Sequence, residues 1–575
     1  MSPTPHGGIL CDLHSRDSSI RSELLTESKN LPSLILSERS LCDLELIMNG
    51  GFSPLKGFMN QEDYHSVLHQ LRLSNGILWS IPITLDITDA KIKSLSIRLG
   101  SRIVLKDPRD HTSLAIMTIN SIWKPNQIEE SEKVFESTDQ LHPSIYYLFN
   151  STHSNYIGGE IQSINLPIHY DYQSIRFTPF QLRQRFQDLS WNKIIAFQTR
   201  NPMHKAHVNL TLRASLEHQH GNLLIHPVVG LTKPGDIDYH TRVKVYKAVL
   251  ETYPKGLATL ALLPLAMRMA GPREAVWHAI IRRNYGATHF IVGRDHAGPG
   301  KSSKGTDFYS PYEAQSLVKK YQNELEIKMI PFGSMIYLPE SDEYKPIQEI
   351  KDGIQTKDLS GTELRRLLQN GDEIPTWFSF SSVIKILKEA YPPKHKQGFV
   401  IFLTGLDRSI KTNLSKALET SLQETSSRSI TLLTNSSPPT LNQTEENSDP
   451  ERLQTHAFLC AELCKSGSAV ISSSNLTSKE INRTYLLESV KKKGGRGANG
   501  MGVLVHVLGG LEDADGDGDG INGNIENNKD SWVNGNGTIN GIVKTNGNGT
   551  INGNGHNGNV KINGKKKLNG FKEIG

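Results

Sequence analysis

The residues with the clearest capacity for chemistry lie in the run QTRNPMHKAH, residues 198–207. An apolar run, residues 193–197, precedes it and a helical pattern, residues 208–217, follows it, which predicts a turn between a strand and a helix. At a helix N-terminus, unpaired backbone N–H groups and the helix dipole attract anions. Arg200, His204 and His207 would add side-chain donors there. The run therefore predicts a site for phosphate or sulfate.

The spacing of His204 and His207 would place both imidazoles on one side of the first helical turn. That geometry suits two contacts along a polyphosphate, and it also suits two ligands of a metal ion. The run lacks the H-E-x-x-H arrangement of zinc sites, and Arg200 would repel a cation. We therefore favour nucleotide phosphate over a metal or over two structural histidines, and we predict no protein metal site.

A second candidate is residues 288–300, THFIVGRDHAGPG, which read as a buried strand that ends in a glycine-rich, charged loop. Gly293, Gly298 and Gly300 would let backbone N–H groups approach an anion, and Arg294 offers a planar donor fork. Ligands of open α/β sheets bind at the carboxyl ends of strands. Two such loops predict one cleft, whereas the loop alone could be an ordinary surface turn.

Together the two loops resemble those of ATP sulfurylase (sulfate adenylyltransferase), particularly the fungal form. Further segments resemble the family in the same order and extend the resemblance over residues 1–395. They are residues 51–59 (GFSPLKGFM), 232–237 (TKPGDI) with Arg242, 267–275 (MRMAGPREA), 331–339 with Met335, and 360–365 (SGTELR).

The resemblance implies a reaction in which a sulfate oxygen attacks the α-phosphorus of ATP and pyrophosphate leaves. Sulfate has no proton to remove, so catalysis would rest on positioning and charge stabilisation rather than on a protein nucleophile or base. Magnesium would enter with ATP, on the β- and γ-phosphates.

The resemblance also implies roles for individual residues. Gln198, Arg200 and the backbone at Ala297 would hold sulfate. Catalysis would fall to Arg200 as the main charge partner of sulfate, to Thr199 and Asn201, which would orient the α-phosphate region, and to two histidines. His204 and His207 would contact the phosphates and steady the transition state. The expected ATP-binding residues, with Met335 at the adenine, are Gln198, Asn201, Gly293, Arg294, Asp295, His296 and Met335.

Two charged segments keep alternative interpretations. Arg268 and Arg273 could reach over the phosphates or form surface ion pairs. Asp236, Asp238 and Arg242 are typical of a charged surface turn, and loop or subunit contacts are the alternative.

Three positions depart from the family pattern. Lys205 keeps the charge of the usual arginine, whereas Val208 and Asn209 replace an Arg-Glu pair, which we expect on the helix flank. Gly333 and Ser334 replace bulkier residues before Met335. We expect this change to loosen the adenine pocket and raise the Michaelis constant for ATP.

The chain of 575 residues is long enough for three domains and a tail. Residues 1–170, with β-type runs at 76–87 and 102–105, predict a compact β-rich domain, which the resemblance likens to a PUA-like fold. Residues 171–396 alternate strands and helices, as in a doubly wound nucleotidyltransferase domain. Residues 392–398 form a linker to a third domain, 397–511, and residues 512–575 form the tail.

The third domain begins with a buried-strand pattern, residues 399–405, that leads into an incomplete P-loop, residues 406–412. Ile410 stands where the loop needs glycine, and Asp407 adds an unfavourable negative charge. The domain resembles adenylyl-sulfate kinase with a disabled loop. We expect it to serve self-association, as a homohexamer, and to offer a site for 3′-phosphoadenosine 5′-phosphosulfate as allosteric inhibitor.

Two rival functions are a bifunctional enzyme, in which Lys411 would still work, and a non-catalytic regulatory subunit. The presence of Arg200, His204, His207 and Arg294 argues against the second.

Composition excludes several classes. The net charge of +5 owes much to lysines near the C-terminus, so nucleic acid is not an expected partner. No apolar run approaches 18 residues and no signal peptide is recognisable, so no membrane is expected. Four cysteines, of which Cys460 and Cys464 would be buried on a helix, agree with a cytoplasmic protein.

The Gly/Asn-rich tail has too few apolar residues to fold alone, and we predict that it is disordered. Its Asp515, Asp517, Asp519 and Glu526 match the spacing of an EF-hand loop, but no amphipathic helices flank them. We interpret this match as coincidental. The Asn-Gly-Thr sites at Asn536 and Asn548 have no meaning without secretion.

Overall fold

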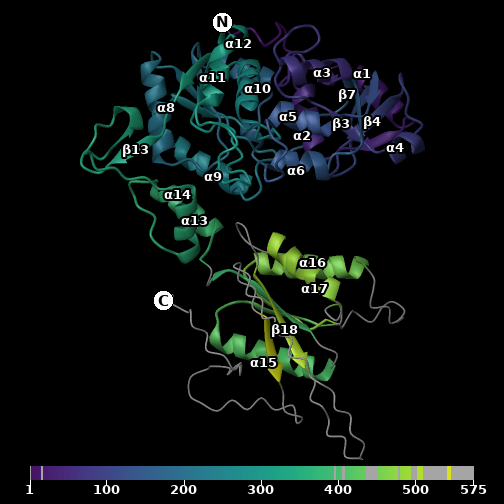
Figure 1. Cartoon of the computed structure of the whole chain (residues 1–575), viewed down its shortest axis with the longest axis vertical. Helices are drawn as coiled ribbons and strands as arrows, with labels where there is room; N and C mark the ends of the chain where they lie inside the picture. The colour runs from purple at the N-terminus through teal and green to yellow at the C-terminus, as the bar shows by residue number, and fades with distance from the viewer. Residues whose placement is uncertain are drawn as a thin grey trace, which may run out of the picture. The chain divides into compact units, whose positions relative to one another are not determined.

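A computed structural model describes residues 2–14, 17–393, 396–404, 408–434, 450–474, 476, 480–493, 501–508 and 540–544. The chain divides into two units (Figure 1). The first unit comprises residues 1–364 and 374–387, and the second comprises residues 365–373 and 388–575.

The first part of the first unit is a mixed sheet in the order β1-β4-β5-β7-β2, with β3 and β6 also paired to β7. The strands are β1 (Ser33–Ile35), β2 (Gly57–Phe58), β3 (Leu85–Ile87), β4 (Arg102–Lys106), β5 (Ser113–Thr118), β6 (Ser121–Trp123) and β7 (Asn155–Ser163). All pairs are antiparallel except β1 with β4. Of the predicted β-type run 76–87, only Leu85–Ile87 is a strand.

Helices in this part are more numerous than its sequence pattern predicted. They are α1 (Ser18–Ser28), α2 (Glu38–Met48), α3 (Gln61–Gln70), α4 (Asp89–Ser94), α5 (Gln127–Phe135) and α6 (Pro143–Asn150). Polar N-caps explain several boundaries, because Ser37, Asn60 and Thr88 each accept a bond from a backbone N–H in the first turn. Helix α2 carries Leu44, Ile47 and Met48 into the core of the unit.

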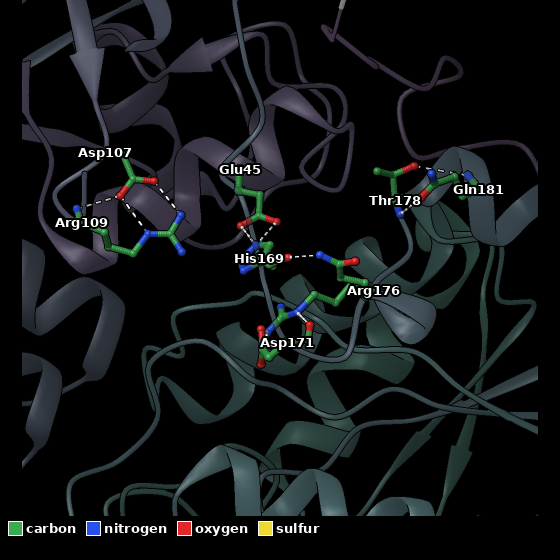
Figure 2. Close-up of polar contacts among 9 residues, drawn as sticks. Glu45, Asp107, Arg109, His169, Asp171, Arg176, Thr178 and Gln181 are labelled. Atoms are coloured by element: carbon green, nitrogen blue, oxygen red, sulfur yellow. Dashed lines mark hydrogen bonds and ion pairs between the residues drawn. The ribbon is translucent and has the colours of Figure 1, made fainter. Parts of the chain in front are cut away.

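Ion pairs and hydrogen bonds fasten the segment that leaves this sheet (Figure 2). His169 Nε2 lies 2.9 Å from Glu45 Oε1 on α2, and Arg176 donates to both oxygens of Asp171 at 3.0 Å. Thr178 and Gln181 then form a capping box that starts α7 (Pro179–Asp188). The path from the first sheet to the second is therefore fixed by side chains.

The second sheet is wholly parallel, in the order β10-β9-β8-β11-β12. Its strands are β8 (Ile194–Phe197), β9 (Asn222–Ile225), β10 (Ala258–Leu260), β11 (His289–Val292) and β12 (Lys328–Pro331). From β8 the chain builds outward through β9 and β10, then returns to the other side of β8 with β11. The strand order thus reverses between β8 and β11, where doubly wound sheets bind their ligands.

Helices and a hairpin complete the unit. The helices are α8 (Lys205–Glu217), α9 (Tyr239–Leu250), α10 (Gly271–Asn284), α11 (Glu313–Lys320), α12 (Gln322–Leu325), α13 (Gly361–Asn370) and α14 (Ser381–Ala390), of which α13 and α14 extend into the second unit. The hairpin pairs β13 (Met335–Leu338) with β14 (Glu343–Pro346). On α8 one face is buried, and it includes the predicted apolar pair, Leu210 and Ala214. Helix α10 differs, because all of its residues are buried.

The second unit holds another parallel sheet, in the order β16-β17-β15-β18-β19. Its elements are β15 (Phe399–Thr404), α15 (Arg408–Thr425), β16 (Ile430–Leu433), α16 (Pro450–Lys465), β17 (Ala469–Ser472), α17 (Glu480–Lys493), β18 (Met501–Leu508) and β19 (Asn540–Lys544). Figure 1 shows α15 on one face of the sheet and α16 with α17 on the other.

The packing of this unit follows the period of two along β15. Val400 and Phe402 pack in a cluster with Cys460 and Cys464 of α16, and Leu403 packs in another with Leu414 of α15. The prediction that Cys460 and Cys464 are buried on a helix is confirmed.

The predicted tail contributes β19, a strand that the sequence pattern did not predict. The EF-hand-like run 515–526, Asn536, Asn548, Gly405 and Asp407 all lie outside the described residues. Among the described helices, none combines the length and apolar character that crossing a bilayer requires.

Candidate active site

The two predicted loops meet in one pocket of about 340 Å³. The loop after β8 and the loop after β11 line it together, and both leave the sheet where the strand order reverses. All the predicted site residues are among its lining: Gln198, Thr199, Arg200, Asn201, His204, His207, Gly293, Arg294, Asp295, His296, Ala297 and Met335. Gly298 and Gly300 are not part of the lining.

Arg200 carries the charge of the first loop, and Asp236 holds it. Arg200 Nη1 donates to both carboxylate oxygens of Asp236 at 2.6 Å, and Nη2 lies 3.4 Å from the carbonyl oxygen of Gly298. Asp236 belongs to the segment predicted as a surface turn, yet its side chain is only 13% exposed. The alternative of a loop contact describes it better.

The turn itself is shaped by hydrogen bonds of short range. The Asn201 backbone N–H donates to Thr199 Oγ1 at 3.1 Å, and Tyr246 donates its hydroxyl proton to the Asn201 carbonyl at 2.9 Å. Gln198 Nε2 lies 3.8 Å from Met267 Sδ. These contacts fix the backbone that carries Arg200.

His204 and His207 lie side by side at the N-terminus of α8. Their ring centroids are 4.1 Å apart, and His207 Nδ1 accepts a bond from the His204 backbone N–H at 3.3 Å. Phe378 stacks on His204 at 4.4 Å. Burial lowers the pKa of His207 to about 4. The pKa of His204 lies well below its usual value, mainly because of burial and also because of the neighbouring His207. Both imidazoles are therefore neutral near pH 7.

The loop after β11 contains two non-glycine residues in the left-handed region. Asp295 has φ 52° and Ala297 has φ 56°. Such strain persists where surrounding contacts hold it, often at ligand sites. Here the Asp295 N–H donates to the Pro311 carbonyl at 2.8 Å, and the Gly298 N–H donates to the Asp295 carbonyl at 3.1 Å. Arg294 lies 3.3 Å from Asp295 and is about half exposed.

Apolar side chains line the remainder of the pocket. Met335 begins β13 and is 9% exposed, and Met267, Ile291 and Ile336 lie around the same space. Sequence reasoning missed Met267, Asp358 and the stacking residue Phe378. Met267 begins the segment 267–275 that resembles the family and could have been found there. Phe378 lies far along the chain, and no local sequence pattern marks it as a site residue.

Arg268 and Arg273 have neither of the roles considered for them, since neither lines the pocket and both are buried. Arg268 pairs with Asp43 at 2.6 Å, and Arg273 donates to the carbonyls of Val67 and Leu68 at 3.1 and 2.8 Å. A buried guanidinium needs such partners, and these lie about 200 residues away in sequence. The two arginines join the start of α10 and the segment before it to helices α2 and α3.

The other charged and variant positions near the site are structural. Asp238 caps α9 by accepting the Thr241 N–H at 2.9 Å, and Arg242 is buried and donates to the Val228 carbonyl at 2.8 Å. Val208 is buried in α8, and Asn209 Nδ2 donates to the Lys205 carbonyl at 2.9 Å.

No group of three or more metal-ligating side chains occurs within the described parts of the chain. The carboxylates that line the pocket are Asp295, which pairs with Arg294, and Asp358. Such a sparse donor set fits magnesium that arrives on the nucleotide as Mg-ATP, because Mg²⁺ keeps most of its ligands as phosphate oxygens and water.

Comparisons with known proteins agree with this geometry. The ATP-sulfurylase family model matches residues 173–390, and a PUA-like domain model matches residues 3–166. The sulfate adenylyltransferase of Mycosarcoma maydis is 51% identical over 516 residues, which cover 89% of each chain. That of Yarrowia lipolytica is 53% identical over 511 residues, 88% of each chain.

A solved structure shares most of the fold. It is described as a hexameric APS kinase from Thiobacillus denitrificans, with a TM-score of 0.71 and 28% identity, covering 88% of this chain and 92% of its own. The predicted fold class is confirmed: a PUA-like domain, a doubly wound catalytic domain and a kinase-like C-terminal part. By its sequence, its fold and its relatives, this chain belongs to the sulfate adenylyltransferase family.

Proposed function

We propose that the pocket between β8 and β11 joins ATP and sulfate to give adenosine 5′-phosphosulfate and pyrophosphate, the first step of sulfate activation. The carrying observation is the convergence of both loops on one pocket at the point where the strand order reverses. This reaction requires hydrogen-bond donors that stabilise negative charge, and it requires no protein nucleophile. The loop after β8 supplies such donors at a helix N-terminus.

Arg200 is the charge partner of sulfate in this proposal, together with Gln198 and the backbone at Ala297. Its ion pair with Asp236 fixes one edge of the guanidinium. Among the residues that the structure describes, Nη2 makes only the long 3.4 Å contact with the Gly298 carbonyl. A planar fork oriented in this way suits a tetrahedral oxyanion. Thr199 and Asn201 shape the turn at the α-phosphate.

His204 and His207 act as neutral hydrogen-bond donors to phosphoryl oxygens. Their lowered pKa values make the imidazolium form rare at neutral pH, so charge stabilisation falls to Arg200 and Arg294. Nδ1 of His204 is buried and has no hydrogen bond within the described chain, which is consistent with a site that a ligand completes. Gly293, Arg294, Asp295, His296 and Met335 receive the nucleotide.

For the rest of the chain we propose domains at residues 1–170, 171–396 and 397–511, followed by the tail 512–575. The kinase-like domain serves self-association as a homohexamer, by analogy with the hexamer named for the similar solved structure. It binds 3′-phosphoadenosine 5′-phosphosulfate as an allosteric inhibitor, and the protein works in the cytoplasm.

The test is pyrophosphate release from Mg-ATP with and without sulfate, coupled to a pyrophosphatase because the phosphosulfate product is high in energy. We expect sulfate-dependent release that Arg200→Ala lowers about 10³-fold. Arg213→Ala is the matched control, because Arg213 lies on α8 outside the pocket and pairs with Glu217 and Glu349. Absence of release from folded, ATP-binding protein would favour the regulatory-subunit alternative.

A further inference from the structure

Three side chains form a buried line from the pocket to α10. His296 lines the pocket, His278 lies behind it, and Glu274 lies one helical turn before His278. His296 Nε2 is 3.0 Å from His278 Nδ1, and His278 Nε2 is 3.3 Å from Glu274 Oε1. Glu274 and His278 have no exposed surface, and His296 is 9% exposed.

Backbone donors fix the far end of this line. The Arg268 N–H donates to Glu274 Oε1 at 2.9 Å, and the Ala270 N–H donates to Oε2 at 2.8 Å. Burial raises the pKa of the Glu274 carboxyl, and these two bonds with the nearby Arg268 guanidinium act against that rise. Since both oxygens accept from backbone groups that can only donate, the arrangement favours the ionised carboxylate.

The proton positions along the line follow from this end. His278 Nε2 lies 3.3 Å from a Glu274 oxygen without hydrogen-bond geometry. A lone pair on Nε2 would be repelled by the negative carboxylate, so Nε2 carries the proton. Burial lowers the pKa values of His278 and His296 well below the ordinary range, so each ring holds one proton. His278 Nδ1 is then an acceptor, His296 Nε2 donates to it, and His296 Nδ1 is left without a proton.

The cationic groups around His296 act in the same direction as burial, whereas the Glu274 carboxylate acts against it. Phe290 packs edge-on against its ring at 5.5 Å, and the charges of Arg282 and Arg200 disfavour an imidazolium there. Arg282 itself is buried and donates to the His226 carbonyl at 3.2 Å.

We propose that Glu274 and His278 are positioning residues that hold His296 with an unprotonated Nδ1, and that His296 accepts a hydrogen bond from the bound nucleotide. Ionised phosphate and sulfate carry no donor, so this nitrogen cannot bind them. The donors that ATP offers are its ribose hydroxyls and its adenine amino group. The inference rests on the proposed function and places His296 at the nucleoside half of the substrate.

Kinetics with ATP analogues test the proposal on the unaltered protein. The analogues are 2′-deoxy-ATP, 3′-deoxy-ATP and purine riboside triphosphate, which lacks the amino group. We expect one of them to have a Michaelis constant about tenfold higher than that of ATP, the effect of losing one hydrogen bond. The analogue that does so identifies the donor. Equal Michaelis constants for all three analogues and ATP would overturn the proposal.

Two substitutions separate positioning from mere packing. His278→Leu should raise the Michaelis constant for ATP about tenfold, leave that for sulfate within about twofold, and abolish the discrimination against the same analogue. His278→Asn, whose side-chain oxygen replaces Nδ1 as acceptor, should restore most of it. If both variants lose rate with both substrates and still discriminate, His278 is a packing residue and the proposal fails.

The ring nitrogens of His296 can also be observed directly by ¹⁵N NMR of histidine-labelled protein, with His296→Gln for assignment. We expect a protonated Nε2 and an unprotonated Nδ1, and the reverse would overturn the proposal at any level of activity. Absence of sulfate-dependent pyrophosphate release together with the expected tautomer would instead reject the proposed function.

Discussion

Two turns of this chain have the same place in the fold and different contents. The turn after β8 and the turn after β15 each lead from a parallel strand to a helix, α8 or α15. After β8, Arg200, His204 and His207 line a pocket. At the start of α15, Ile410 packs with the apolar cluster of Leu403 and Leu414, and Lys411 is 2% exposed.

We infer from this comparison that the topology offers an anion site and that the turn residues decide which anion, if any, it binds. A P-loop lysine must reach phosphates, and a glycine must let the backbone wrap them. An isoleucine in that place forms part of a core instead. Activity therefore has to be argued from each turn and not from the fold.

The largest expected difference is between the two units. It is a difference in how much stability each unit loses at acidic pH. Burial lowers the pKa of many histidines in the first unit: His6, His142, His204, His207, His226, His278, His289 and His296. Among the described residues of the second unit, burial lowers the pKa of His456 alone. A lowered pKa means that the unfolded chain binds more protons below pH 6.5, so stability falls as the pH falls from 6.5 toward 4.

Each such histidine can remove about 1.4 kcal/mol per pH unit in that window. The buried carboxyls Asp43, Glu130 and Glu274, whose pKa values burial raises, offset part of the loss. We expect the first unit to lose several kcal/mol more than the second between pH 7 and 5. Urea unfolding followed by tryptophan fluorescence reports mainly the first unit, which holds five of the six tryptophans: Trp79, Trp123, Trp191, Trp277 and Trp377. Hydrogen exchange at β15 and β17 reports the second, and equal losses would contradict the prediction.

The sequence predicted the site better than it predicted what supports the site. The loops after β8 and β11 were found because a buried strand followed by polar or glycine residues is a local pattern. Asp236, 36 residues from Arg200, and Asp43, 225 residues from Arg268, were not recognised as partners. Such pairs follow from tertiary packing, and no spacing in the sequence encodes them. The helices of residues 1–170 were missed because most are short, with 6 to 11 residues.

A substitution at His204 tests the catalytic role of the turn after β8. We expect His204→Ala to lower kcat about 10²-fold and to change the Michaelis constant for ATP by less than about threefold, because the donor acts on charge that develops in the transition state. In the unaltered protein, these histidines should add no titration to kcat between pH 5.5 and 8, since their pKa values lie well below this range.

His218→Ala is the control for this experiment, because His218 lies just beyond α8 and outside the pocket. A kcat that rises as the pH falls through 6.5 and loses this dependence in His204→Ala would show an imidazolium at work, against the neutral-donor role.

A smaller effect is expected where the pocket departs from the family pattern. Gly333 lines the pocket, and a Cβ there would come too close to the side-chain amide of Gln348, so this flexible end must shift to admit it. Gly333→Ala should lower the Michaelis constant for ATP about two- to threefold, since one added methyl group contributes about 0.8 kcal/mol of apolar contact. Gly361→Ala is the control, because Gly361 does not line the pocket and a Cβ there would meet no atom within 4 Å. An unchanged or higher constant would show that Gly333 does not loosen the adenine site.

The smallest effect is expected at Lys411, and it sharpens the comparison most. Lys411 is the residue that a working P-loop would require, yet it is buried at the start of α15 beside Ile410, which fills a core position. Lys411→Met keeps the length of the side chain and removes its charge, so sulfate-dependent pyrophosphate release should stay within about twofold. ADP formation from ATP and adenosine 5′-phosphosulfate should be absent before and after the change. ADP formation that Lys411→Met abolishes would restore the bifunctional alternative, because it would show that the Lys411 ammonium group takes part in phosphoryl transfer. Arg200→Ala should leave the ADP-formation assay unchanged. This control tests whether the turn after β8 and the turn after β15 act independently.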